Sequence, residues 1–104
     1  MKQVPLTLRR STHPSRPVLV VEVAESSLSF DREDKGGLYA REGIRDYWII
    51  NLVDRLLEVY RDPGEDPTAL YGSRYRRVER LGPGETVSPL ALATVRLAVR
   101  DLLP

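Results

Sequence analysis

Two charged residues, Glu22 and Lys35, stand out as candidates for catalysis. Glu22 interrupts an apolar run over residues 18–23, and Lys35 follows thirteen residues later. A carboxylate on a buried strand can hold Mg²⁺, a hard cation that takes few protein oxygens. An ammonium beside it can orient an attacking water or stabilise the charge that develops on a phosphate. The pair therefore suits metal-dependent hydrolysis of a phosphodiester.

The same two residues also allow a structural interpretation. Buried charges in proteins are generally paired, so Glu22 and Lys35 could simply form an ion pair, or Lys35 could be a solvated lysine in the first turn of a helix. Apart from Lys2 near the N-terminus, Lys35 is the only lysine among the 16 basic residues. Arginine cannot replace a compact ammonium at a metal-dependent site, which favours a constrained role for Lys35.

The composition excludes several other kinds of site. The chain has 104 residues, which fits one domain. It has no cysteine, which excludes disulfides, thiolate zinc sites and thiol nucleophiles. His13 is the only histidine, so one chain cannot build a multi-histidine metal site. The 16 basic and 15 acidic residues nearly balance, so net charge gives no bulk attraction to nucleic acid.

The sequence carries no sign of a membrane or secretory protein. No apolar run approaches the roughly 18 residues of a membrane span. The N-terminus lacks the apolar segment and the cleavage site of a signal peptide. We therefore expect a cytoplasmic protein that does not bind a membrane.

Hydrophobic patterning predicts a strand followed by a helix around the two candidate residues. The β-branched run over residues 18–23 is typical of a strand that is covered on both faces. Residues 26–31 are polar and indicate a linker. Asp31 is the expected N-cap of a helix over residues 32–42, which Gly43 ends.

Two glycines weaken the predicted helix. Gly36 and Gly37 lie in its middle, where each costs about 1 kcal/mol relative to alanine. This predicts either the close approach of another backbone or a helix that is weak here. The three-and-four spacing places Lys35 and Tyr39 on one helix face.

The remaining sequence indicates a mixed sheet. Three prolines interrupt residues 1–17, which we expect to form a flexible arm with a short strand near residues 4–8. The order of strand, helix and further strands predicts an α/β or α+β fold with one main helix. We expect strands at residues 46–52, 56–61, 73–81 and 87–89, turns at 53–55 and 82–84, a loop at 62–71 and an irregular closing segment at 90–103.

Several motifs follow one another in the order seen in a known family. The sequence resembles the Uma-two family, a group of restriction endonucleases in the PD-(D/E)XK nuclease superfamily. The resemblance covers residues 14–104 and is most specific between residues 19 and 63. It is carried by LVVEVA at 19–24, Ser27, Asp31-Arg32, Lys35, LYAR at 38–41, Gly43-Ile44, YWII at 47–50, LEVYR at 57–61, Pro63, GETVSPL at 84–90 and DLLP at 101–104.

The resemblance implies a fold, an activity and roles for particular residues. The fold would be a restriction-endonuclease-like mixed sheet, and the activity Mg²⁺- or Mn²⁺-dependent cleavage of DNA. Glu22 would be the metal-binding and catalytic glutamate. Lys35 would be the catalytic lysine, displaced from the strand to the following helix. Tyr39 and Tyr47 match positions that line the same region.

The chain also departs from the family pattern. Family members carry a longer N-terminal half, with a strand that bears the Pro-Asp of the superfamily motif. No Pro-Asp precedes Glu22 here, so we expect residues 18–104 to be a partial nuclease-like domain that lacks the N-terminal part of the core. The second metal carboxylate is then absent, and Mg²⁺ or Mn²⁺ should bind weakly. Glu25 and Asp31 are the candidates to replace it, although neither lies on a strand.

Three functional interpretations stay open at this point. The chain could be an active endonuclease, a non-catalytic remnant that serves as a binding or oligomerising module, or a fragment whose true start lies upstream. The arginines of residues 73–81 could contact a DNA backbone or form a solvated strand face. Without an upstream neighbour, the strand at residues 18–23 would expose an unpaired edge. We therefore predict a homo-oligomer or a partner chain bound at this edge.

Overall fold

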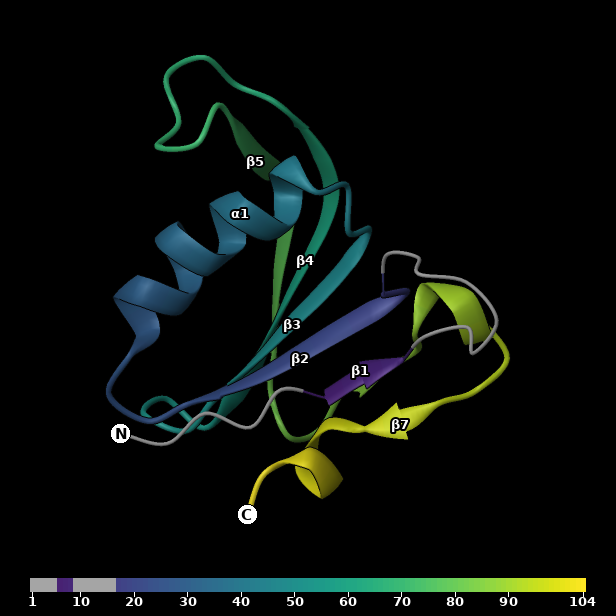
Figure 1. The fold of residues 1–104 in the computed structure, drawn as a ribbon. Coiled ribbons are helices and arrows are strands. Elements are labelled where there is room, and N and C mark those ends of the chain that lie inside the picture. The colour runs from purple at the N-terminus through teal and green to yellow at the C-terminus, as the bar shows by residue number, and fades with distance from the viewer. Residues whose placement is uncertain (1–5, 9–16) are drawn as a thin grey trace.

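A single mixed sheet organises the protein. The computed structural model describes residues 6–8 and 17–104, and five strands form the sheet in the order β1-β2-β3-β4-β5 (Figure 1). Strands β2 and β3 are parallel, and the other neighbouring pairs are antiparallel. The mixed α/β sheet with one main helix is thus confirmed. The strands are β1 (Leu6–Leu8), β2 (Leu19–Ala24), β3 (Asp46–Asn51), β4 (Leu56–Glu65) and β5 (Ser73–Leu81).

The helix crosses one face of this sheet and begins earlier than predicted. A π-helical turn at Phe30–Lys35 continues into α1 (Gly36–Arg41), and residues 28 and 29 are already helical. The linker predicted for residues 26–31 is therefore wrong in its second half. Asp31 is not the N-cap, because its N–H donates to the carbonyl of Ser27 at 2.9 Å, within the first turn. Gly43 has φ of 75°, which confirms it as the residue that ends the helix.

Each face of the sheet has its own hydrophobic core. The alternation of side chains along β2 and β3 sends one set towards the helix and the other towards the C-terminal segment. Figure 1 shows the helix and β7 on opposite sides of the sheet. The helix-side core is Val20, Ala24, Ala40, Ile44, Tyr47, Ile49, Tyr60 and Tyr75, and the other core is Leu19, Val21, Trp48, Ile50, Leu57, Val59, Val87 and Val99.

Strand β4 is longer than the sequence indicated. Its pairing with β3 ends at Asp46 and Arg61, but its pairing with β5 continues to Glu65 and Ser73. The loop predicted from residue 62 therefore starts after residue 65. Beyond Arg61 the strand has a neighbour on one side only, which is where a sheet tolerates a proline such as Pro63.

The C-terminal segment forms a small second sheet over the far core, which is the core on the sheet face opposite the helix. Strands β6 (Thr86–Val87) and β7 (Leu97–Ala98) pair antiparallel. Two 3₁₀ turns, Leu90–Leu92 and Val99–Leu102, flank β7 in sequence. The segment predicted as irregular therefore contains a short strand and two turns, and it places Val99 in the far core.

Strand β1 covers part of the β2 edge that was predicted to be unpaired. It pairs with β2 from Leu6 opposite Val21 to Leu8 opposite Leu19, so this part of β2 is not an unpaired edge. Residues 1–5 and 9–16 of the predicted arm lie outside the described residues. The flexibility of the arm therefore stays a prediction. Self-association also stays a prediction. Within the described ranges, no helix is long and apolar enough to cross a membrane.

Candidate functional site

Glu22 lies in the middle of β2 on the face that the helix covers. Its neighbours on that face, Val20 and Ala24, belong to the helix-side core. On the sheet it lies opposite Ile49 of β3. Only 1% of Glu22 is exposed, so its carboxylate is held away from bulk water. A carboxylate in this position is costly unless cations or hydrogen-bond donors meet it.

Two donors from the helix meet one oxygen of Glu22. Lys35 Nζ lies 3.0 Å from Glu22 Oε2, and the hydroxyl of Tyr39 donates to the same oxygen at 2.8 Å. Lys35 and Tyr39 are four residues apart, so one helix face delivers both side chains. The other oxygen, Oε1, is buried and has no hydrogen-bond partner among the described residues. The sequence thus located the ion pair correctly but could not show that one oxygen stays open.

Asp31 brings a second buried carboxylate to the same ammonium. Its Oδ1 lies 3.8 Å from Lys35 Nζ, and its Oδ2 accepts a hydrogen bond from the hydroxyl of Ser27 at 2.8 Å. Asp31 is fully buried. The spacing of four residues from Ser27 to Asp31 and from Asp31 to Lys35 was a usable signal in the sequence, but Asp31 was predicted as an N-cap and as one of two candidates for a second carboxylate without use of this spacing.

The two predicted tyrosines contribute in different ways. Tyr39 binds Glu22 directly, whereas the Tyr47 hydroxyl donates to the main-chain carbonyl of Asp31 at 2.8 Å. Their rings pack edge to face with 4.9 Å between centroids. Burial, together with the nearby carboxylates, raises the pKa of both phenols far above neutral. Both therefore act as neutral hydrogen-bond donors and not as general bases.

Glu25 does not join this cluster. It is exposed and lies just after the end of β2. In the described part of the chain, no hydrogen bond or ion pair connects it with Glu22. Of the two candidates to replace a second carboxylate, the structure therefore places Asp31 beside Lys35 and leaves Glu25 on the surface.

A further buried carboxylate, Glu58 on β4, was missed from the sequence. It accepts hydrogen bonds from Asn51 Nδ2 at 2.9 Å, from the Tyr60 hydroxyl at 2.6 Å and from both Nε and Nη2 of Arg32. Burial by itself would raise the pKa of Glu58, but the hydrogen bonds from Arg32, Tyr60 and Asn51 outweigh it and hold the pKa below its usual value. Both carboxylate oxygens of Glu58 therefore accept hydrogen bonds, and we assign this residue a structural role.

The fit of a divalent cation can be judged from these contacts. Among the described residues, no group of three or more histidine, cysteine, aspartate or glutamate side chains could hold a metal ion. Glu22 is also the first acidic residue of the chain, so β1 supplies no carboxylate. The buried Oε1 of Glu22, to which no residue within 6–8 and 17–104 donates a hydrogen bond, is nevertheless a suitable oxygen ligand. The residues fit a cation that takes few protein ligands and completes its shell with water and substrate oxygens.

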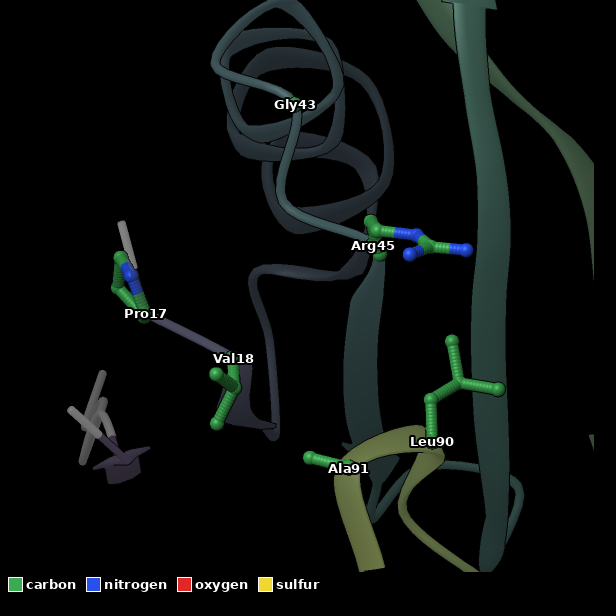
Figure 2. A pocket seen from close by; sticks show the side chains of 6 residues that line it. All are labelled: Pro17, Val18, Gly43, Arg45, Leu90 and Ala91. Atoms are coloured by element: carbon green, nitrogen blue, oxygen red, sulfur yellow. The ribbon is translucent and has the colours of Figure 1, made fainter. Parts of the chain in front are cut away.

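One cavity lies away from this cluster. It has a volume of about 390 Å³ and is formed where β2 and β3 begin, by Pro17, Val18, Gly43, Arg45, Leu90 and Ala91 (Figure 2). Apart from Arg45, whose guanidinium points towards β4, these lining side chains are small or apolar. None of the charged residues around Glu22 lines the cavity, so it is not the candidate site.

The arginines of β5 are largely paired with acidic neighbours. Arg74 lies 2.9 Å from Asp66, Arg76 lies 3.1 Å from Asp62, and Arg80 lies 3.2 Å from Asp54. The arginines of these pairs are more than half exposed. The strand is therefore a solvated charged face, as one of the two interpretations predicted, and its contact with DNA stays a prediction.

Comparison with known proteins gives one result. A family model described as "Uma2: Putative restriction endonuclease" matches residues 2–100, nearly the whole chain. Searches of curated proteins and of solved structures found no match. The matched range includes the Glu22, Asp31, Lys35 and Tyr39 cluster and both cores.

Proposed function

Because this chain belongs to the Uma2 family, as the resemblance to the Uma-two pattern predicted, we propose that it hydrolyses phosphodiester bonds in DNA at the Glu22–Lys35 pair. One observation carries this proposal. Glu22 has a buried oxygen with no hydrogen-bond partner among the described residues, while Lys35 Nζ lies 3.0 Å from its other carboxylate oxygen. A structural ion pair alone does not need an oxygen that is left without a partner.

Each residue of the cluster has a distinct part in this proposal. Glu22 Oε1 would hold Mg²⁺ or Mn²⁺, and such an ion supplies Lewis-acid stabilisation and lowers the pKa of a bound water. Lys35 places a positive charge beside the reacting phosphate, where it stabilises the charge of the transition state. Tyr39 fixes Oε2 of Glu22 and thereby orients Oε1. With few protein ligands, affinity for the metal is expected to be weak and to rise when DNA phosphate is present.

Cleavage of plasmid DNA tests the proposal. Purified protein is incubated with supercoiled DNA and Mg²⁺ or Mn²⁺, and we expect nicked and linear products that disappear when a chelator is added. Glu22→Ala and Lys35→Ala should each abolish cleavage. The matched control is Glu79→Gln, which neutralises an exposed carboxylate on β5 and should cleave like the unaltered protein. Absence of cleavage with either metal contradicts the proposal.

A second candidate function is a non-catalytic module of the same fold. It is favoured by the absence of a three-ligand acidic cluster among the described residues and by β1, whose residues Leu6, Thr7 and Leu8 include no carboxylate. This candidate predicts a stably folded protein that does not cleave DNA and that tolerates Glu22→Gln. It would act through binding or self-association, which size-exclusion chromatography with light scattering measures directly.

A further inference from the structure

Three arginines come together at a pocket outside the cluster of Glu22, Asp31, Lys35 and Tyr39. This arginine pocket has a volume of about 490 Å³ and is lined by Arg45, Arg61, Asp62, Pro63, Arg77 and Leu90. Arg45 directly precedes β3, Arg61 lies on β4 and Arg77 lies on β5. Three neighbouring strands thus bring positive side chains to one concave part of the surface.

The sheet register places two of these charges directly opposite each other. Arg61 lies opposite Arg77 across β4 and β5, and opposite Asp46 across β3 and β4. Like charges directly opposite on neighbouring strands destabilise a sheet. Arg61 is compensated, because its Nε lies 2.9 Å from Asp46 Oδ1 and its Nη2 donates to the carbonyl of Ser88 at 2.6 Å. An anion bound to Arg77 would offset the remaining repulsion.

A further positive charge at the pocket comes from Arg45. Its side chain is exposed, and its guanidinium points towards β4 (Figure 2). No ion pair or side-chain hydrogen bond joins it with any residue of the described ranges 6–8 and 17–104. Residues 1–21 include no aspartate or glutamate, so the rest of the chain supplies no carboxylate either. The charge of Arg45 is therefore not balanced by a carboxylate of the protein.

Acidic residues near Arg77 compensate its charge only weakly. Its ion pair in the described part of the chain is with Glu79 at 3.9 Å, and both side chains are more than half exposed. Exposed pairs contribute little, because solvent screens them. Asp62, the acidic residue of the pocket lining, already lies 3.1 Å from Arg76. The pocket therefore holds two guanidinium groups, those of Arg45 and Arg77, without a closely bound counter-charge.

We propose that the arginine pocket binds a phosphate group of the DNA backbone through Arg45 and Arg77. A planar guanidinium presents paired N–H donors that match two phosphate oxygens, and a phosphate between the two side chains offsets the charge of both. The choice of DNA as the source of the phosphate rests on the proposed function. The phosphate bound here is not the reacting one, because no residue of the cluster around Glu22 lines the pocket.

DNA binding without metal tests the inference. Fluorescence anisotropy of a short labelled duplex is measured with a chelator present, which prevents metal-dependent cleavage. The double variant Arg45→Gln/Arg77→Gln should bind about tenfold more weakly than the unaltered protein at about 0.1 M salt. The slope of log affinity against log salt concentration should become shallower by about two, because two phosphate contacts are lost.

The matched control removes the same net charge outside the pocket. Arg96→Gln/Arg100→Gln alters two exposed arginines of the C-terminal segment, neither of which lines the pocket. We expect this control to keep nearly the affinity and the salt dependence of the unaltered protein. Equal losses in the two double variants show that net charge alone attracts the DNA, and they overturn the proposal.

Inorganic phosphate, used as a probe on the unaltered protein, tests the site without any substitution. NMR signals of the arginine Nε–H groups are followed during the titration. Saturable shifts confined to the pocket arginines support a built phosphate site, whereas uniform or absent shifts overturn it. Saturable shifts without a loss of DNA affinity in Arg45→Gln/Arg77→Gln assign the pocket to free phosphate and contradict the contact with DNA.

The two proposals can fail separately. A protein that loses DNA affinity in Arg45→Gln/Arg77→Gln but never cleaves DNA supports the backbone contact and contradicts the nuclease. A protein whose cleavage requires Glu22 but whose DNA affinity does not depend on the two arginines supports the nuclease and contradicts the backbone contact.

Discussion

Glu22 and Glu58 face the helix from the two strands that flank β3, with Ile49 between them in register. Each of these buried carboxylates meets a cation from the helix, Lys35 for Glu22 and Arg32 for Glu58. Residues three apart lie on the same helix face, so one face of the helix binds both strands that flank β3. The two ion pairs thus fix the helix across the sheet, although the Glu22 pair leaves one carboxylate oxygen without a hydrogen-bond partner in the part of the chain that the structure describes.

Neutralisation of Glu58 should change how stability depends on pH. The partners of Glu58 hold its pKa below the ordinary value of 4.5, so its charged form stabilises the fold above that pH. This contribution is lost as the pH falls through the lowered pKa. Glu58→Gln should therefore lower the free energy of unfolding by about 2 kcal/mol at pH 7 and by much less in strong acid. Urea denaturation at a series of pH values measures both effects.

The exposed Glu79 provides the control for this experiment. Glu79→Gln should leave the free energy of unfolding within about 0.5 kcal/mol at every pH, because surface substitutions rarely exceed that effect. If Glu58→Gln and the unaltered protein lose stability in parallel on acidification, the carboxylate of Glu58 does not stabilise the fold in the way its contacts indicate.

The two adjacent helix glycines should respond in opposite directions to alanine. A Cβ on Gly36 would lie 3.5 Å from the carbonyl of Asp31, an ordinary contact, so Gly36→Ala should stabilise the fold by about 0.5–1 kcal/mol. A Cβ on Gly37 would lie 2.9 Å from Cδ2 of Tyr71, so Gly37→Ala should destabilise it by about 1–2 kcal/mol. Thermal unfolding of the two variants measures the difference.

Removal of the Tyr71 ring should reverse the effect at Gly37. In a Tyr71→Ala background the ring no longer opposes the new methyl group, and Gly37→Ala should then stabilise the helix like Gly36→Ala. A double-mutant cycle measures this coupling. The explanation fails if Gly37→Ala has the same effect with and without the tyrosine ring. The predicted close approach is thus found at Gly37, where it involves a side chain and not a backbone.

Local patterns predicted much of the sheet, because a buried strand consists of apolar residues and a half-buried strand alternates apolar and polar residues. The apolar runs at residues 18–23 and 46–52 and the alternation at residues 73–81 agree closely with β2, β3 and β5. The extension of β4 could not be predicted, because Pro63 and Gly64 indicate a loop unless the long partner β5 is known. The length of β4 depends on its pairing with β5, which local sequence patterns do not show.

The candidate site was predictable in part for the same reason. Glu22 was visible as a charge inside a buried run, and Lys35 as an isolated lysine on the next helix, and the structure brings them together. Glu58 was not visible, because an acidic residue on an alternating strand usually marks the solvent face. Only the packing of the helix over β4 shows that this face is buried. Asp31 was wrongly predicted as the N-cap, because aspartate is a favoured N-cap residue and the sequence does not show that the helix begins earlier.

Loss of the Asp46 charge should destabilise the fold and change the fluorescence of Trp48. Asp46 is fully buried and accepts hydrogen bonds from the Trp48 indole at 2.7 Å, from Arg61 Nε at 2.9 Å and from the N–H of Leu90 at 2.9 Å. Asp46→Asn leaves the largely buried Arg61 without its counter-charge, so we expect a loss of about 3 kcal/mol. Trp48 is the only tryptophan, and its emission reports the change directly. The exposed Asp101→Asn should alter neither quantity.

Removal of the Tyr39 hydroxyl should weaken metal binding and cleavage, with only a modest loss of fold stability. Tyr39→Phe keeps the ring packed on Tyr47 but removes the 2.8 Å hydrogen bond that orients Glu22, and we expect it to lower the free energy of unfolding by about 1–2 kcal/mol. The control Tyr75→Phe removes a buried hydroxyl that binds the carbonyl of Ile44 at 2.6 Å, away from Glu22. Mn²⁺ affinity and cleavage should fall in Tyr39→Phe and persist in Tyr75→Phe. Equal losses in both variants would show that Tyr39 supports the fold alone, because a purely structural hydroxyl has no reason to change the affinity for a cation.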